Sequence, residues 1–150
     1  MELTKNSWII RRLQPGERIP YDLLLLADPS RKMIDSYLTG SEVYLLQQAQ
    51  VTLGILALSR HGHALEVKNV AVAPDYQRQG VGSYLLEHAI RIASSKALEI
   101  RIGTANSSVY QLLLYQLLGF QISSIERVFP LLIILCRFTK TAYRQNISSF

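Results

Sequence analysis

The stretch Gln77-Arg78-Gln79-Gly80-Val81-Gly82 determines the fold that this sequence predicts. It follows an apolar, strand-like run at 67–73 and a turn at Pro74-Asp75, and it leads into an amphipathic helix from about Ser83. The first N–H groups of a helix have no partner inside it and lie at the positive end of its dipole, so they attract anions. Gly80 and Gly82 have no Cβ atom to hold a phosphate away from those amides. The stretch therefore predicts a pyrophosphate site.

Two other phosphate-binding motifs fit less well. The glycines are not followed by Gly-Lys-Ser/Thr, which the Walker loop requires. The dinucleotide fingerprint requires three glycines directly after a strand and an acidic residue about 20 positions further on. The 77–82 stretch has two glycines and follows a turn. A glycine-containing turn in some other α/β protein is the remaining alternative.

Periodicity and turn residues predict the other elements in the order β-αα-βββ-α-β-α-β. Gly119 is expected to end the last helix, with Ser107 or Ser108 as its N-cap. No repeat or linker interrupts the pattern, so we expect residues 1–150 to form a single domain. The expected strands are 7–12, 43–48, 51–60, 64–72, 99–104 and 120–127, and the expected helices are 20–27, 31–38, about 83 onward, and a last one through 118.

The 77–82 stretch matches the Gln/Arg-x-x-Gly-x-Gly/Ala signature of the GCN5-related N-acetyltransferases (GNAT superfamily). The chain resembles small bacterial members of that family from Trp8 to Arg127, most strongly from Glu66 to Phe120. The resemblance implies an α/β (α+β) fold with a mixed central sheet of six to seven strands and about four helices. It also implies transfer of an acetyl group from acetyl-coenzyme A to a primary amine, by direct attack in a ternary complex. The tail departs from the family after Arg127: either Leu131 to Phe138 forms a seventh strand, or the terminus is altered.

The resemblance assigns the donor side of the site. The residues expected to bind the pyrophosphate are Gln77, Arg78, Gln79, Gly80, Val81, Gly82 and Ser83. The main chain of Val70, Ala71 and Val72 would pair with the pantetheine arm along an edge where this strand splays from its neighbour. A backbone N–H there can polarise the thioester oxygen. Asn106 is placed to bond the pantetheine, although an ordinary N-cap or turn asparagine explains it equally well.

Tyr115 is the candidate general acid. It begins Tyr115-Gln116-Leu117-Leu118-Gly119-Phe120, which resembles the family's Tyr-x-x-x-Gly-Phe ending, where a tyrosine hydroxyl protonates the departing thiolate. Tyr110 competes for this role, but its spacing turns it away from the face of Tyr115. A half-buried tyrosine that only closes the core is the alternative.

Glu66 is the candidate base, because a glutamate at this place in many relatives takes the proton of the amine. Strand alternation puts it on one face with Lys68 and Val70, so an ion pair with Lys68 is the structural alternative. His61 and His63 titrate in the right range but fall in a turn. No second cluster of His, Cys or Asp accompanies them, so no metal is expected.

The amino-acid composition limits the kinds of partner that the protein is expected to have. With 49% hydrophobic and 18% charged residues the chain is globular, and the formal charge of +5 is spread without a basic cluster, which disfavours nucleic acid. No run is long enough for a membrane span. The only cysteine, Cys136, and the absence of a secretory segment predict a cytoplasmic protein, and the cysteine's place in the divergent tail disfavours an acyl-cysteine route.

The acceptor stays open between a small-molecule amine, a polyamine and a protein amine; Asp22, Asp28 and Asp35 could attract a cation. A non-catalytic acyl-coenzyme A sensor and a basic nucleic-acid-binding domain are the rival functions. The apolar run Leu131 to Leu135 needs cover, so a homodimer through the C-terminal segment is also expected.

Overall fold

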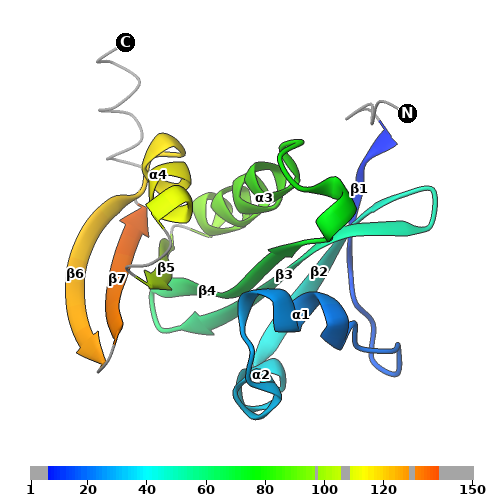
Figure 1. The fold of residues 1–150 in the computed structure, drawn as a ribbon, viewed down its shortest axis with the longest axis horizontal. Helices are drawn as coiled ribbons and strands as arrows, with labels where there is room; N and C mark the ends of the chain where they lie inside the picture. The colour runs from blue at the N-terminus through cyan, green and yellow to red at the C-terminus, as the bar shows by residue number, and fades with distance from the viewer. Residues whose placement is uncertain (1–6, 97, 106–108, 129–130, 139–150) are drawn as a thin grey trace. The chain divides into compact units, whose positions relative to one another are not determined.

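The computed structural model describes residues 7–96, 98–105, 109–128 and 131–138. These residues form a mixed α+β fold, as predicted, and most elements lie near their expected bounds (Figure 1). The helix after the glycines begins earlier than expected, at Val81. In chain order the elements are β1 (Ile9–Arg12), α1 (Tyr21–Ala27), α2 (Arg31–Leu38), β2 (Ser41–Gln48), β3 (Val51–His61), β4 (Ala64–Val72), a 3₁₀ turn (Pro74–Tyr76), α3 (Val81–Ser95), β5 (Glu99–Ala105), α4 (Val109–Leu117), β6 (Gln121–Val128) and β7 (Leu131–Phe138).

The seven strands form one mixed sheet in the order β1-β2-β3-β4-β5-β7-β6. β4 and β5 run parallel, whereas β7 pairs antiparallel with both β5 and β6. The divergent tail thus builds the seventh strand that the sequence left as one of two possibilities. β7 pairs with β5 from Ile133 to Phe138 and with β6 from Leu131 to Arg137, so its main chain finds hydrogen-bond partners inside the sheet.

The chain divides into two compact units. The first contains residues 1–59 and 68–86, and the second contains 60–67 and 87–150. Strand β4 and helix α3 each contribute residues to both. The single domain expected from the sequence stays a prediction.

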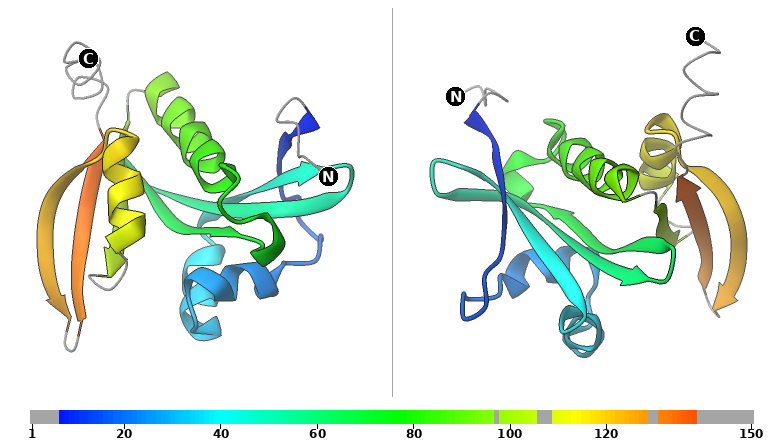
Figure 2. Two further views of the ribbon diagram at one scale, coloured as in Figure 1. Left: turned by 45° about the horizontal axis from the view of Figure 1, so that its top comes forward. Right: turned by 180° about the vertical axis from the view of Figure 1, so that it is seen from behind.

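The core of the first unit is formed by helices α1 and α2 packed on one face of the sheet, with the start of α3 on the other (Figure 2). Leu24 and Ile34 of these helices are fully buried against Ile55 of β3. Gly54 points to the α3 face: a Cβ atom here would lie 2.9 Å from the carbonyl oxygen of Ala71 and 2.9 Å from Cδ1 of Leu85. Only glycine allows α3 to approach β3 this closely.

The second unit packs α4 against its strands through aromatic side chains. The rings of Tyr115 and Phe120 lie 6.0 Å apart, and those of Phe120 and Phe138 lie 5.5 Å apart. Gly119 follows α4 with φ +104°, and its N–H donates to the carbonyl of Gln116. This is the left-handed glycine that the sequence predicted at the end of the helix.

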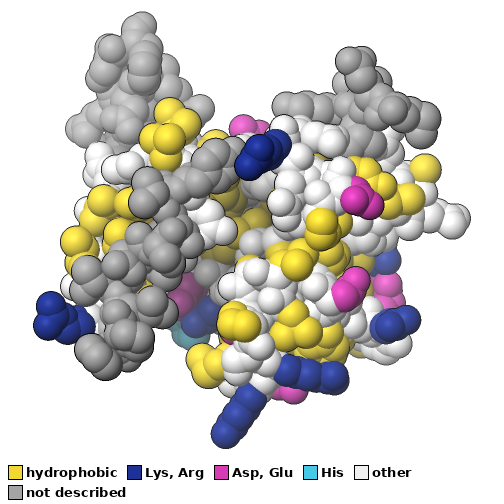
Figure 3. Space-filling view, in the orientation of Figure 1, with side chains coloured by type: hydrophobic (Ala, Val, Ile, Leu, Met, Phe, Trp, Pro, Cys, Tyr) yellow, Lys and Arg dark blue, Asp and Glu magenta, His cyan; other side chains and the backbone are white. Residues whose placement is uncertain are grey.

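Charged side chains are dispersed on the surface. Lys and Arg residues stand in several separate places on the face shown in Figure 3, in keeping with the diffuse positive charge expected from the sequence. Within the described ranges, no helix is both long and apolar enough to cross a membrane.

Candidate active site

The loop between β4 and α3 has a left-handed backbone at two positions, Arg78 with φ +62° and Gly80 with φ +86°. Glycine adopts this conformation freely, but for arginine it costs roughly 1 kcal/mol or more. Strain of this kind is retained where the surrounding structure demands it, and functional loops are a common place for it. The two residues turn the chain so that it enters α3 directly at Val81.

Helix α3 begins with open backbone amides. The N–H of Tyr84 donates to the carbonyl of Gly80 at 3.0 Å, which makes this the first hydrogen bond of the helix. The amides of Val81, Gly82 and Ser83 therefore lie in the first turn, where a helix offers them no acceptor. No acidic residue occupies this turn to offset the positive end of the dipole.

Space is also open at this helix end. A Cβ atom at Gly82 would meet Cγ2 of Val72 at 3.6 Å, an ordinary contact, and no other described atom within 4 Å apart from its chain neighbours and the backbone of its own helix. The predicted phosphate residues from Gln77 to Ser83 are thus brought together at one loop–helix junction, inside the first unit. Open amides at a helix N-terminus of this kind attract anionic groups such as phosphates.

Gln77 ties this loop to the end of β4. Its Nε2 donates to the carbonyl oxygen of Val72 at 3.2 Å. That carbonyl belongs to the stretch expected to pair with the pantetheine arm. Since a carbonyl oxygen has two lone pairs, this hydrogen bond leaves it able to accept a second.

The pairing of β4 with β5 covers only the first part of the strand. Its pairing with β5 runs from Ala64 to Val67 and ends there, so Val70, Ala71 and Val72 lie beyond it. Ala71 is buried in the core under α1 and α2, whereas Val70 and Val72 are half-buried on the other face. Any ligand along this edge would meet main-chain groups, which do not depend on the identity of the side chains.

Asn69 is a structural residue that the sequence analysis missed. It is 3% exposed, and its Nδ2 donates to the carbonyl oxygen of Leu24 at 2.9 Å and to the hydroxyl of Tyr37 at 3.0 Å. These bonds fasten β4 to α1 and α2 directly before Val70. A polar residue at an inward position of an apolar strand was the available signal.

Tyr115 lies in the second unit and is 4% exposed. Burial, with a contribution from nearby Cys136, raises the pKa of Tyr115 to about 12. The hydroxyl therefore keeps its proton throughout the neutral range, as a general acid must. Cys136 is fully buried, and burial raises the pKa of its thiol as well, which makes it a poor nucleophile.

Glu66 shares a half-buried face of β4 with Lys68 and Val70, as strand alternation predicted. Its Oε2 lies 3.6 Å from Nε2 of His61, the last residue of β3. His61, expected from the sequence in a turn, is thus a neighbour of the candidate base. Both side chains are partly exposed, at 58% for His61 and 39% for Glu66.

Asn106 lies outside the described residues, and so does the side chain of Tyr110 in α4. Among the residues that are described, no group of three or more His, Cys, Asp or Glu could hold a metal ion.

Comparisons with known proteins identify the family of this chain. Residues 39–122 match the model of the acetyltransferase (GNAT) domain family. The chain is 40% identical over 123 residues to the uncharacterized N-acetyltransferase YvbK of Bacillus subtilis, covering 79% of each chain.

Solved structures extend the likeness to the fold. A GNAT family acetyltransferase from Elizabethkingia anophelis with acetyl-CoA bound is 38% identical, with a TM-score of 0.85 over 90% of this chain and 99% of that one. A Bacillus subtilis acetyltransferase in complex with CoA is 32% identical, with a TM-score of 0.79 over 88% and 98%. Since the family model spans more than half of the sequence and the relatives match over most of their length, the chain belongs to the GNAT family of acetyltransferases.

Proposed function

We propose that this GNAT acetyltransferase binds acetyl-coenzyme A between the 77–83 junction and the edge of β4, and passes the acetyl group directly to a primary amine. The observation that carries this proposal is the junction itself. A left-handed Gly80, an open helix N-terminus and the end of the β4 edge at Val72 lie together within one unit. One compact unit of the protein thus offers amides for the diphosphate and main chain for the pantetheine arm.

Binding of acetyl-coenzyme A along β4 also explains how the thioester is polarised. A backbone N–H among Val70, Ala71 and Val72 donates to the carbonyl oxygen, where negative charge develops as the amine attacks. One such donor contributes on the order of 10²- to 10³-fold to the rate of acyl transfer. Because the donor is main chain, substitution of these side chains alters the rate only through packing.

The amine attacks the thioester carbonyl carbon, the carbon–sulfur bond breaks, and the electron pair leaves with sulfur. Holding both reactants in one complex supplies much of the acceleration. A prior transfer to Cys136 is disfavoured, because that thiol is fully buried and its pKa is raised by burial. This supports direct attack by the amine.

Glu66 takes the proton that the amine loses, directly or through water. Its partly exposed carboxylate leaves a path to solvent, and His61 at 3.6 Å can receive the proton next. Tyr115 supplies the proton to the departing thiolate, because its hydroxyl is protonated at working pH.

The acceptor is a primary amine, and the acidic residues of the first helices do not narrow it further. Oδ1 of Asp28 accepts a hydrogen bond from the backbone N–H of Ser30, and Oδ1 of Asp35 accepts one from the Tyr21 hydroxyl. Both carboxylates thus have local structural partners. The rival reading as a non-catalytic acyl-coenzyme A sensor is not favoured, because the matched relatives are named acetyltransferases.

The test is release of free thiol from acetyl-coenzyme A by the purified protein across a panel of amines: alkylamines, polyamines, aminoglycosides, and peptides with a free N-terminus or a lysine. Product masses identify which amine was acetylated. Thiol release that depends on one amine class supports the proposal. Coenzyme binding without thiol release for any amine would instead support the sensor.

The homodimer also stays a prediction. In the second unit, Ile122 and Ile125 of β6 are exposed at 44% and 61%, and β6 ends the strand order of the sheet. A second copy of the chain would cover them. Light scattering at high protein concentration measures the mass of the particle in solution. The mass of a monomer would contradict the prediction.

A further inference from the structure

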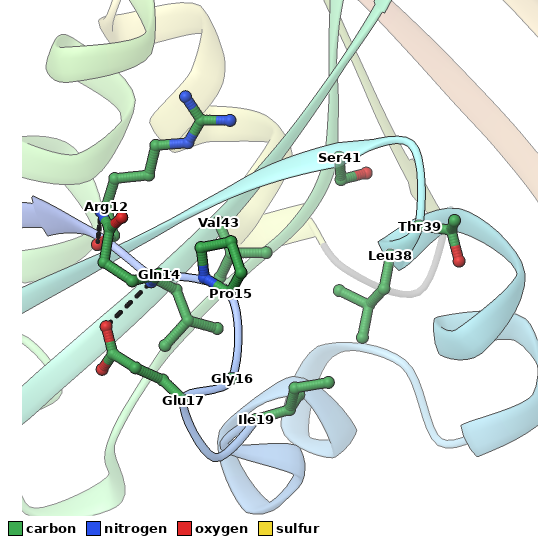
Figure 4. A pocket seen from close by; sticks show the side chains of 11 residues that line it. Arg12, Gln14, Pro15, Gly16, Glu17, Ile19, Leu38, Thr39, Ser41 and Val43 are labelled. Atoms are coloured by element: carbon green, nitrogen blue, oxygen red, sulfur yellow. Dashed lines mark hydrogen bonds between the residues drawn. The ribbon is translucent and has the colours of Figure 1, made fainter.

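A cavity of about 580 Å³ lies in the first unit, away from the residues assigned to the coenzyme (Figure 4). It is bounded by the loop from Leu13 to Ile19, by the end of α2, and by the start of β2. Its volume falls in the range of sites that take small molecules. No residue from 69 to 83 lines it.

The loop over the cavity is held in place by hydrogen bonds. The N–H of Leu13 donates to the carbonyl of Val43 at 2.7 Å, and the N–H of Gln14 donates to Oε1 of Glu17 at 2.8 Å. Arg11 adds a two-pronged contact to the same carboxylate, at 2.8 and 2.9 Å. Gly16 makes the turn with φ +87°. The cavity is therefore preformed, and a ligand would not have to order the loop first.

Apolar side chains form the floor. Figure 4 shows Ile19, Leu38 and Val43 directed toward the space between the loop and α2. Val43 is only 7% exposed, and Ile19 and Leu38 pack against the core cluster that contains it. This floor suits an apolar group of about the size of an aromatic ring.

Hydrogen-bond acceptors form part of the rim. Helix α2 ends at Leu38 beside the cavity, with Thr39 as its C-cap. The last carbonyls of a helix lack partners within it. Ser41, also in the wall, donates its hydroxyl to the carbonyl of Tyr37 at 2.6 Å and keeps lone pairs of its own. A ligand that donates a hydrogen bond would be held at this end.

The charges around the cavity are already paired. Glu17 is bound by Arg11, which lowers the pKa of Glu17 below its usual range. Arg12, the other charged residue of the wall, lies 3.6 Å from Glu42. An ion entering the cavity would lose water without meeting an unpaired opposite charge in the wall, and this disfavours charged ligands.

We propose that this cavity binds an uncharged small molecule that has an apolar body and a hydroxyl or similar donor, at a site separate from the coenzyme. The proposal goes beyond acetyl transfer, and it holds or fails independently of it.

The experiment uses three probes of nearly one shape: benzyl alcohol, benzylammonium and benzoate. Each is titrated into the isotope-labelled full chain at neutral pH, without acetyl-coenzyme A, while the methyl signals of Ile19, Leu38 and Val43 are followed by NMR. Benzyl alcohol is expected to shift these signals saturably, and each ion to bind at least about tenfold more weakly. An ion that binds as tightly as the alcohol, or no saturable shift with the alcohol, overturns the proposal.

Cavity-filling variants locate the binding. Val43→Phe places a ring in the cavity and should weaken benzyl alcohol binding at least about tenfold. If it fails to fold, Ile19→Phe makes the same test at a half-buried position. Ile9→Phe is the matched control, because Ile9 is 65% exposed and does not line the cavity. Undiminished binding in a folded filling variant, or an equal loss in the control, contradicts the assignment.

Discussion

Replacement of Gly82 by aspartate should weaken coenzyme binding without destabilising the protein. The new carboxylate would stand in the first turn of α3, where the diphosphate is expected. At about 5 Å and an effective dielectric of about 20, each pair of unit charges repels by about 3 kcal/mol. Screening at physiological salt reduces this to about 2 kcal/mol, so affinity for coenzyme A should fall about 30-fold.

The substitution should not lower the stability of the folded protein. The added Cβ meets only Cγ2 of Val72 at 3.6 Å among described atoms, and the wild-type first turn has no acid. An acidic residue there stabilises a helix by about 0.3–1 kcal/mol, and the loss of a helical glycine adds to this. The melting temperature should stay the same or rise by about 2–4 °C.

Calorimetric titration with coenzyme A at low and moderate salt, together with thermal unfolding, measures both effects. Gly82→Ala separates the bulk of the side chain from its charge. Gly40→Asp adds the same charge where a Cβ would have nothing within 4 Å, and should leave affinity unchanged. Unchanged affinity in a folded Gly82→Asp protein, or a deficit that does not shrink with salt, would refute the phosphate site.

Other substitutions test the remaining roles. Tyr115→Phe should lower kcat about 10²-fold with coenzyme affinity unchanged, and full activity would reduce Tyr115 to a packing residue. Glu66→Gln should depress the rate most near neutral pH and progressively less toward the pKa of the amine, whereas a constant deficit across the pH profile would indicate positioning rather than proton transfer. His61→Gln should produce a smaller deficit of the same shape, and a wild-type profile would remove His61 from the proton path. Gly54→Ala should cost about 1–3 kcal/mol in urea unfolding, because its Cβ would press on the carbonyl of Ala71 at 2.9 Å, and wild-type stability would contradict the packing of α3 on β3.

Local features of the sequence predicted much of this structure. Alternation along 64–72 placed Glu66 on one face with Lys68 and Val70, and the glycine after α4 was predicted from its position. The start of α3 was set too late, because low helix propensity makes glycine look like a loop residue, although Gly82 lies inside the helix.

Contacts between distant segments were not predictable in the same way. The placement of β7 between β5 and β6 depends on pairing that periodicity does not encode. The contact of His61 with Glu66, and the bonds from Asn69 to α1 and α2, join residues of different elements. The cavity beside Val43 likewise exists only once the 13–19 loop is folded over β2.

Two-substrate kinetics test the central claim, direct transfer of acetyl from acetyl-coenzyme A to an amine. Initial rates are measured over a grid of acetyl-coenzyme A and of the best amine from the panel, with acetylated amine and free coenzyme A both quantified. Direct transfer predicts equal amounts of the two products and reciprocal plots that intersect, as a ternary complex requires. Parallel plots would indicate an acyl-enzyme, and tight coenzyme binding with no acetylated amine would contradict catalysis altogether.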